Sequence, residues 1–334
     1  MIDAKLIDFV SSCNDYVITF HQNPDGDAIG SGLALHLFLR KLGKRGVVVS
    51  PNAIGDYLKW LPDIDNVLNY EDSPHSNNKT LKQAGAIFCL DFNDPNRAGE
   101  LENSIIDSKA KKVLIDHHLE PKKFAQFEYH DTQSPATAQL IFNLISEIDE
   151  SMLDAEIATC LYTGLMTDTG SFRFPSTNAQ THLAISKLMQ TGFNHAVIHE
   201  NIFDTYTENQ LHLLGNTISQ RHEIISEFST SYMYVTLTDY ETYNIQKGDT
   251  EGLVNYNLQL EGVNFGVLFI ENEEMVKISF RSKGDFPANE FAKRYFQGGG
   301  HLNAAGGRSF ISLERTIKRF KSKLKDFVEE FPIN

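Results

Sequence analysis

The first half of the chain alternates short apolar runs with longer stretches of helical periodicity. The runs are continuous rather than alternating, which is typical of strands buried on both faces of a parallel sheet. They lie at residues 16–20, 46–49, 86–90 and 112–115, and the helical stretches lie at residues 28–42, 140–148, 155–166 and 179–189. This order predicts an α/β fold with an N-terminal parallel sheet.

The pattern changes after residue 191. Residues 192–221 are polar with helical character, and we interpret them as a connector between two domains, residues 1–191 and 222–334. The second part has alternating runs at residues 232–237, 263–270 and 275–280, followed by predicted helices at residues 288–296 and 313–327. These features predict a smaller C-terminal α/β domain.

Length and composition exclude several classes of protein. A chain of 334 residues favours two domains, and no stretch approaches the roughly 18 apolar residues of a membrane span. The first residues are partly acidic and do not resemble a secretory signal. The three cysteines are widely spaced and form no CxxC pair, which suits reduced thiols in a cytoplasmic protein.

Charge is distributed unevenly along the chain. The net charge is −14, but residues 276–334 contain 12 Lys and Arg against 6 Asp and Glu, so the preceding part carries −20. A strongly acidic majority argues against tight binding of long nucleic acids. A carboxylate-rich metal site in one domain and a basic face on the other would explain the division, as would ordinary solvated helices.

Polar residues that can bind metals cluster at the ends of successive elements. They are His21, Asp25 and Asp27 in HQNPDGD after the first run, Asp91 after the third, Asp116, His117 and His118 after the fourth, and Asp168 after a helix. The carboxyl ends of parallel strands form a common edge where ligands bind. Taken singly, each segment could be a turn or a helix cap, but together they predict one site.

Carboxylates mixed with imidazoles are typical ligands of Mn²⁺. Because Asp25 and Asp27 are two residues apart, with Gly26 between them, they can address two different ions. A pair of ions needs a shared carboxylate, for which Asp91 is the candidate, and such a pair activates water for attack on phosphorus. The sequence therefore predicts a two-metal centre that binds Mn²⁺, with Mg²⁺ as an alternative.

A glycine-rich segment is the main polar signal of the second domain. It reads GGGHLNAAGG over residues 298–307, and Arg281 precedes it at a predicted strand end. We expect its amides and the start of a following helix, which the two alanines would open, to bind phosphate together with His301 and Arg281. The alternative is a tight glycine turn that serves packing alone.

These motifs, in this order, resemble the DHH phosphoesterase superfamily, in the branch of bacterial nano-RNases and phosphatases of 3'-phosphoadenosine-5'-phosphate (pAp). The resemblance spans nearly the whole chain. It implies that one Mn²⁺ is bound by His21, Asp25 and Asp91, and a second by Asp27, Asp91, His117 and Asp168. It also implies that His118 contacts the scissile phosphate or its leaving oxygen and that Asp116 orients a histidine. The far end of the substrate would be bound by Arg281, Gly299, Gly300 and His301. Arg97 matches a supporting position, with a surface salt bridge as the alternative.

The expected activity is hydrolysis of dinucleotide-sized RNA to mononucleotides, of pAp to AMP, or of both. A cyclic or linear dinucleotide phosphodiesterase uses the same parts and stays open, as does a nucleotide-binding regulator without catalysis. A manganese pyrophosphatase should lack the glycine-rich segment, and an exonuclease for long DNA would need a larger chain with a basic or aromatic surface. The oligomeric state is also open, with a homodimer as one option.

Overall fold

The computed structural model describes residues 2–246 and 248–332, and these divide into two compact units between Thr205 and Tyr206. Each unit has one six-stranded sheet with helices on both faces. The strands of the first unit are β1 (Asp15–Thr19), β2 (Arg45–Ser50), β3 (Leu68–Asn69), β4 (Ala86–Leu90), β5 (Lys111–Asp116) and β6 (Phe127–His130).

The first sheet is parallel throughout, in the order β3-β2-β1-β4-β5-β6. Strand order reverses between β1 and β4, so the connections that leave these two strands run to opposite sides. In sheets of this kind the reversal opens a crevice beyond the carboxyl ends of the two strands. Residue 21 and residue 91 follow β1 and β4 at that position.

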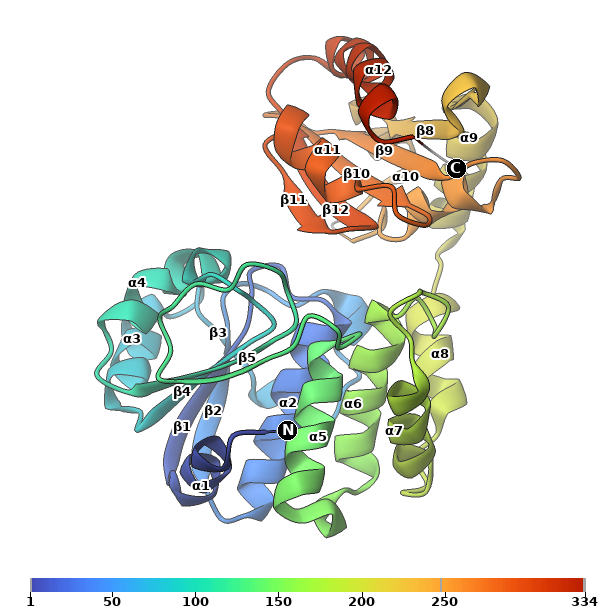
Figure 1. Ribbon diagram of the computed structural model, residues 1–334. Helices are drawn as coiled ribbons and strands as arrows, with labels where there is room; N and C mark the ends of the chain where they lie inside the picture. The colour runs from blue at the N-terminus through green and yellow to red at the C-terminus, as the bar shows by residue number, and fades with distance from the viewer. Residues whose placement is uncertain (1, 247, 333–334) are drawn as a thin grey trace. The chain divides into compact units, whose positions relative to one another are not determined.

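Two hydrophobic layers cover this sheet. On one face Ile18 and Phe20 pack with the helices α1 (Ala4–Ser12), α2 (Gly26–Lys41), α5 (Thr137–Asp149), α6 (Ala155–Asp168), α7 (Ala179–Met189) and α8 (His195–Phe203). On the other face Val17 and Cys89 pack with α3 (Pro74–Gln83) and α4 (Glu102–Asp107). Figure 1 shows α5, α6 and α7 side by side on one side of the strands. The continuous apolar runs follow from burial on both faces.

The second unit has a mixed sheet in the order β11-β12-β10-β9-β8-β7, in which β8 and β9 are parallel and the other pairs antiparallel. Its strands are β7 (His222–Ile225), β8 (Thr230–Val235), β9 (Phe265–Glu271), β10 (Val276–Ser282), β11 (Gly299–His301) and β12 (Ala304–Ser309). Its helices are α9 (Glu208–Gln220), α10 (Leu237–Tyr243), α11 (Ala288–Tyr295) and α12 (Leu313–Glu330). A phenylalanine-rich core lies between the sheet and α11 and α12.

The predicted α/β architecture with two sheets is confirmed, and the differences lie in five strands and in the expected connector. The pattern missed β3, β6, β7, β11 and β12, which are short or rich in glycine. The residues expected to form a connector contain α8 and α9, which belong to different units.

The expectation that Ala304 and Ala305 open a helix was wrong. They begin β12, which pairs antiparallel with β11. Glycine and alanine carry little steric preference, so the close pairing of the two strands decides the conformation there. No helix begins at the two alanines, and that part of the proposed phosphate site is removed.

Among the described residues, no helix combines the length and the apolar character that crossing a membrane demands.

Candidate metal centre

The loop after β1 places His21 and Asp25 at the crevice. Asp25 is the N-cap of α2, where its Oδ1 accepts hydrogen bonds from the amides of Asp27 and Ala28 at 3.0 and 3.1 Å. This is the ordinary role of an aspartate before a helix. The same Oδ1 lies 3.8 Å from His21 Nε2, while His21 Nδ1 bonds the carbonyl of Gln22 at 3.0 Å. The carboxylate of Asp25 therefore both caps helix α2 and lies beside His21 in the candidate metal centre.

Asp91 lies at the middle of the cluster. It is 2% exposed and has a left-handed φ of 62°, which is unusual for a residue other than glycine. Its Oδ2 lies 3.4 Å from His21 Nε2, and its Oδ1 lies 3.5 Å from His117 Nε2. Asp91 thus contacts a histidine on each side, which is the position that a bridging carboxylate requires. Strained backbone of this kind is frequent at functional sites.

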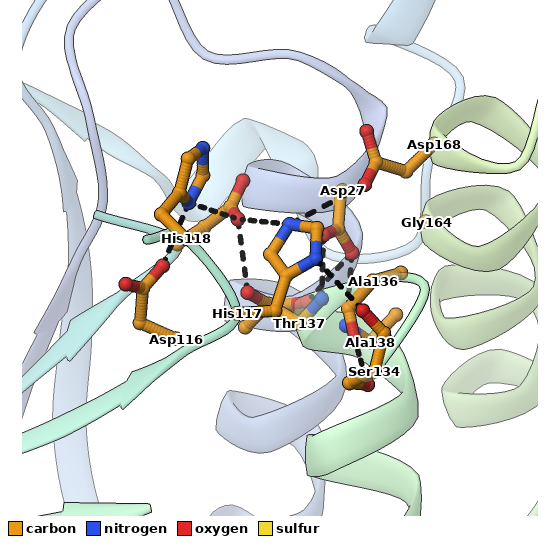
Figure 2. A network of polar contacts seen from close by, with 12 residues as sticks. Asp27, Asp116, His117, His118, Ser134, Ala136, Thr137, Ala138, Gly164 and Asp168 are labelled. Carbon is orange, nitrogen blue, oxygen red and sulfur yellow. Dashed lines mark hydrogen bonds and ion pairs between the residues drawn. The ribbon is translucent and has the colours of Figure 1, made fainter. Parts of the chain in front are cut away.

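Asp27 joins two helices that are distant in sequence. Its carboxylate accepts hydrogen bonds from the amides of Thr137 and Ala138 at 2.7 and 2.9 Å, so a residue of α2 caps the N-terminus of α5 (Figure 2). The residue before α5 is Ala136, whose side chain cannot cap a helix. Gly164 of α6 is close on the other side, where an added Cβ would lie 2.8 Å from Asp27 Oδ1.

His117 and Asp168 complete this side of the cluster. His117 Nδ1 bonds the carbonyl of Ser134 at 3.1 Å, which turns Nε2 toward the carboxylates. That Nε2 lies 3.3 Å from Asp168 Oδ2 and 3.9 Å from Asp27 Oδ2. Figure 2 shows the imidazole beside Asp27, with Asp168 on the same side of the ring. Asp168 is the last residue of α6, and its side chain retains 28% of its surface exposed.

The carboxylates are crowded enough to disturb each other's ionisation. Burial and the charges of Asp91 and Asp168 raise the pKa of Asp27 well above its ordinary value. Burial, with Asp25 and Asp91, raises the pKa of Asp168 to about 7. Burial would also raise the pKa of Asp91, but hydrogen bonding with His117 and His21 outweighs it and holds that pKa well below the usual range. Such displaced pKa values are typical of functional sites.

The histidines respond in the opposite sense. Burial disfavours the imidazolium of His21, yet hydrogen bonding with Asp25 and Asp91 outweighs burial and raises its pKa to about 10. The pKa of His117 is raised well above its usual value, because Asp91 and Asp168 outweigh the effect of burial. In the metal-free protein, protons on the histidines thus offset part of the repulsion among the carboxylates.

The donor atoms fit two divalent cations. Three ligand atoms lie within 4.8 Å of one another in each of two groups. The first group is His21, Asp25 and Asp91, and the second is Asp27, His117 and Asp168. Oxygen and imidazole donors suit Mn²⁺ or Mg²⁺. A positive charge in each group would relieve the repulsion that displaces the pKa values. The structure therefore contains two adjacent candidate metal sites.

His118 lies beside the cluster and is supported from behind. Its Nδ1 bonds Asp116 Oδ1 at 2.8 Å and lies 3.7 Å from Asp91 Oδ1 (Figure 2). Asp116 is fully buried, and within the described chain its Oδ2 has no hydrogen-bond partner, although His130 Nε2 approaches to 4.0 Å. His130 Nε2 also bonds the carbonyl of His118 at 2.5 Å. Asp116 thus orients His118 rather than His117.

Arg97 supports the site through its backbone. Its carbonyl accepts a hydrogen bond from the amide of Gln22 at 2.7 Å, which ties the segment after β4 to the loop after β1. Among the ion pairs of the described residues, none involves Arg97, so the surface salt bridge is not observed.

The predicted phosphate-binding residues belong to the second unit. Arg281 is the last but one residue of β10 and donates from Nη1 to the carbonyl of Phe280 at 3.0 Å. Gly300 has a φ of 143°, and an added Cβ would lie 2.5 Å from the carbonyl oxygen of Ala304. Gly299 has open space around it. Glycine is therefore required at position 300 by the close pairing of β11 with β12.

Sequence reasoning missed the residues that orient the ligands. Thr137 is the clearest case, because its hydroxyl donates to Asp91 Oδ1 at 2.9 Å while its amide donates to Asp27. His130 and Ser134 were also missed. The segment SPAT at residues 134–137, just before a helix, was the available signal, since Ser, Pro and Thr are common at helix starts.

Comparison with known proteins defines the class of this chain. The N-terminal domain of the DHH family matches residues 15–165, and the DHHA1 domain matches residues 229–330. The chain belongs to the DHH family and is a phosphoesterase, that is, a hydrolase. The predicted membership of this family and the predicted class of enzyme are confirmed.

Individual relatives are similar over most of their length. The bifunctional oligoribonuclease and PAP phosphatase NrnA of Thermus thermophilus is 30% identical over 314 residues, which cover 93% of this chain and 89% of that protein. The protein of the same name from Bacillus subtilis is 26% identical over 305 residues, which cover 91% and 92%. The crystal structure of an exopolyphosphatase-related protein from Bacteroides fragilis has a TM-score of 0.94 and 36% identity, and covers 98% of this chain and 97% of that one.

Proposed function

We propose that this phosphoesterase hydrolyses dinucleotide-sized RNA to mononucleotides and pAp to AMP, using two Mn²⁺ ions. The observation that carries the proposal is the position of Asp91, which lies between the groups around His21 and His117. The similarity to two proteins named as bifunctional oligoribonuclease and PAP phosphatase supports the choice of substrates. We assign His21, Asp25 and Asp91 to one ion, and Asp27, Asp91, His117 and Asp168 to the other.

When bound, the two ions would supply an activated water and neutralise charge that develops on the phosphate. Each protein group then has a defined task. Thr137 holds the carboxylates of Asp27 and Asp91 through its amide and hydroxyl. Asp116 fixes the ring of His118 through Nδ1, so that the opposite nitrogen can contact the scissile phosphate or give a proton to the leaving oxygen.

Selectivity for short substrates follows from charge. The first 275 residues carry a net −20, which repels a long polyanion, whereas a substrate with few phosphates is held by the metals. We assign the other end of the substrate to Arg281, Gly299, Gly300 and His301 of the second unit. All three cysteines are buried free thiols, which supports our proposal of a cytoplasmic location.

A substrate panel with Mn²⁺ tests this function. It contains dinucleotide RNA, a longer RNA oligomer, pAp, pyrophosphate and a cyclic dinucleotide, each with and without chelator. We expect dinucleotide or pAp to be hydrolysed fastest and chelator to abolish hydrolysis. Pyrophosphate as the fastest substrate would overturn the proposal, and activity that resists the chelator would overturn the metal mechanism.

Two matched aspartate variants accompany the panel, one inside the metal centre and one outside it as the control. Asp91→Asn removes the bridging carboxylate and should abolish hydrolysis of every substrate in the panel. Asp63→Asn changes another largely buried aspartate that contacts a histidine, His36, outside the metal centre, and should leave hydrolysis unchanged. If the unmodified chain cleaves no compound of the panel, a nucleotide-binding role without catalysis replaces the proposal.

A further inference from the structure

A pocket of about 270 Å³ lies at the carboxyl ends of β2 and β3 in the first unit. Its apolar walls are Ala53, Ile54, Ile64 and Val67, and the other lining residues are polar or charged, namely Ser50, Lys59, Asp65 and Asn69. Small-molecule sites combine apolar walls with a few polar groups in this way. None of the sequence motifs described above falls in this region, and none of the residues assigned to the metals lines the pocket.

The pocket is nevertheless joined to the metal centre. β2 pairs with β1, the strand that leads to His21. Asn52, which lies between pocket residues 50 and 53, accepts a hydrogen bond from the amide of Asn23 at 2.6 Å and donates to its Oδ1 at 3.2 Å. Asn23 lies midway between His21 and Asp25 and has a left-handed φ of 54°. The buried Asn52 thus fixes the pocket wall and the ligand loop as one piece.

The chemistry of the two proposed substrates points to an occupant. In dinucleotide RNA, water adds to the bridging phosphorus, the bond to the 3' oxygen breaks, and that oxygen takes up a proton. The phosphate remains on the 5' oxygen of the second nucleoside. pAp has the same nucleotide and the same 3' phosphate, but it lacks the second nucleoside and releases inorganic phosphate. One site for both substrates therefore needs a space beyond the scissile phosphate that only the dinucleotide fills.

We propose that the pocket at the ends of β2 and β3 binds the nucleoside on the 3' side of the scissile phosphate. This inference rests on the proposed function. The base contacts the apolar walls around Ile54 and Ile64, and Ser50 and Asn69 lie where they can hydrogen-bond the base edge or the ribose hydroxyls. The pocket explains how one metal centre accepts both a diester and a monoester, since pAp leaves this space to water.

The test fills the pocket and compares the two substrates. Ala53 is exposed at the pocket wall, so Ala53→Trp adds bulk without disturbing the core. We expect Ala53→Trp to raise the KM for dinucleotide RNA about tenfold and to leave the kcat and KM for pAp unchanged. Ala155→Trp, at the exposed start of α6, is the matched control and should change neither. Equal effects on both substrates, or no effect on either, would overturn the proposal.

A binding measurement separates this inference from the proposed function. Dinucleotides with 2-aminopurine in the first or the second position are titrated with Mn²⁺ present, and a methylene group in place of the bridging 3' oxygen prevents their hydrolysis. The second-position reporter should change fluorescence with the unmodified chain and not with Ala53→Trp, while the first-position reporter responds to both. If the chain cleaves neither substrate, the proposed function fails, yet this titration still decides whether the pocket binds a base. No response from the second position contradicts the pocket assignment.

Discussion

Helix α2 carries a buried cluster of histidine and aspartate side chains near each end, and the two clusters differ in their charge balance. Near its start, Asp27 joins the metal centre. Near its other end, His36 Nε2 lies 3.2 Å from Asp63 Oδ2, and Asp63 also accepts hydrogen bonds from Arg40 at 3.0 and 3.1 Å and from Asn66 at 2.7 Å. We call this second group the His36 cluster; it also includes Tyr16, whose hydroxyl bonds His36 Nδ1 at 3.1 Å.

Every charge of the His36 cluster has a partner. Arg40 neutralises Asp63, and burial lowers the pKa of His36, so its imidazole stays neutral. The metal centre instead gathers Asp25, Asp27, Asp91 and Asp168, whose mutual repulsion is only partly offset by histidines. Burial of histidine and aspartate together therefore does not mark a functional site by itself. Buried charge without a partner does mark such a site, because its cost in stability is tolerated where a bound ligand offsets it.

The largest expected contrast comes from Asp168→Asn. We expect kcat/KM with Mn²⁺ to fall about a thousandfold, because the second ion loses a charged ligand. The folded-state pKa of Asp168 is raised to about 7, so ionisation of this carboxyl destabilises the folded state. The loss of stability begins as the pH rises above the unfolded-state pKa and reaches its full size above pH 7. The metal-free variant should therefore be at least as stable as the unmodified chain at pH 8.

Activity assays and thermal unfolding in chelator test Asp168→Asn together. Mn²⁺ should raise the melting temperature of the variant less than that of the unmodified chain. A variant that is active but less stable without metal would show that Asp168 behaves like the His36 cluster instead.

Metal binding should depend steeply on pH. With a pKa of about 10, His21 is protonated throughout pH 6–8 and must lose that proton to bind an ion, and Asp168 adds a second proton below about pH 7. Affinity for Mn²⁺ should rise by about a factor of ten or more per pH unit in this range. Calorimetry in buffers of different ionisation enthalpy measures the released protons, and the absence of any release contradicts the charge imbalance.

The orientation of the carboxylates can be weakened without removing a ligand. Thr137→Val keeps the amide that donates to Asp27 and removes the hydroxyl that donates to Asp91, so affinity for Mn²⁺ should fall about tenfold. Thr137→Ser retains the hydroxyl and should bind Mn²⁺ nearly as well as the unmodified chain. Titration of the metal into each variant provides the measurement, and equal affinities for Val and Ser would exclude this role.

The smallest effect is expected in the His36 cluster. Asp63→Asn tolerates the left-handed φ of 62° at this position but loses the charge that pairs with Arg40. The free energy of unfolding should drop by about 1 kcal/mol with hydrolysis unchanged. Urea unfolding monitors the loss. A fall in activity without a fall in stability would mean that both ends of α2 serve catalysis.

Local pattern predicted the elements that have a strong period. The four apolar runs of the first half correspond to β1, β2, β4 and β5, and α7 spans the predicted residues 179–189. The edge strands β3 and β6 escaped prediction because they have two and four residues and little apolar continuity. The glycine-rich hairpin escaped because glycine and alanine leave the conformation to strand pairing.

The sequence by itself determined which ligand-type side chains follow which strands, since a parallel sheet brings the carboxyl ends of its strands to one edge. Only the tertiary structure decided how those side chains are held. Thr137 meets Asp27 and Asp91 because α5 packs beside α2, and His130 meets His118 because β6 pairs with β5. These contacts join residues that are distant along the chain. No local period records them, because each depends on how helices and strands pack after they form.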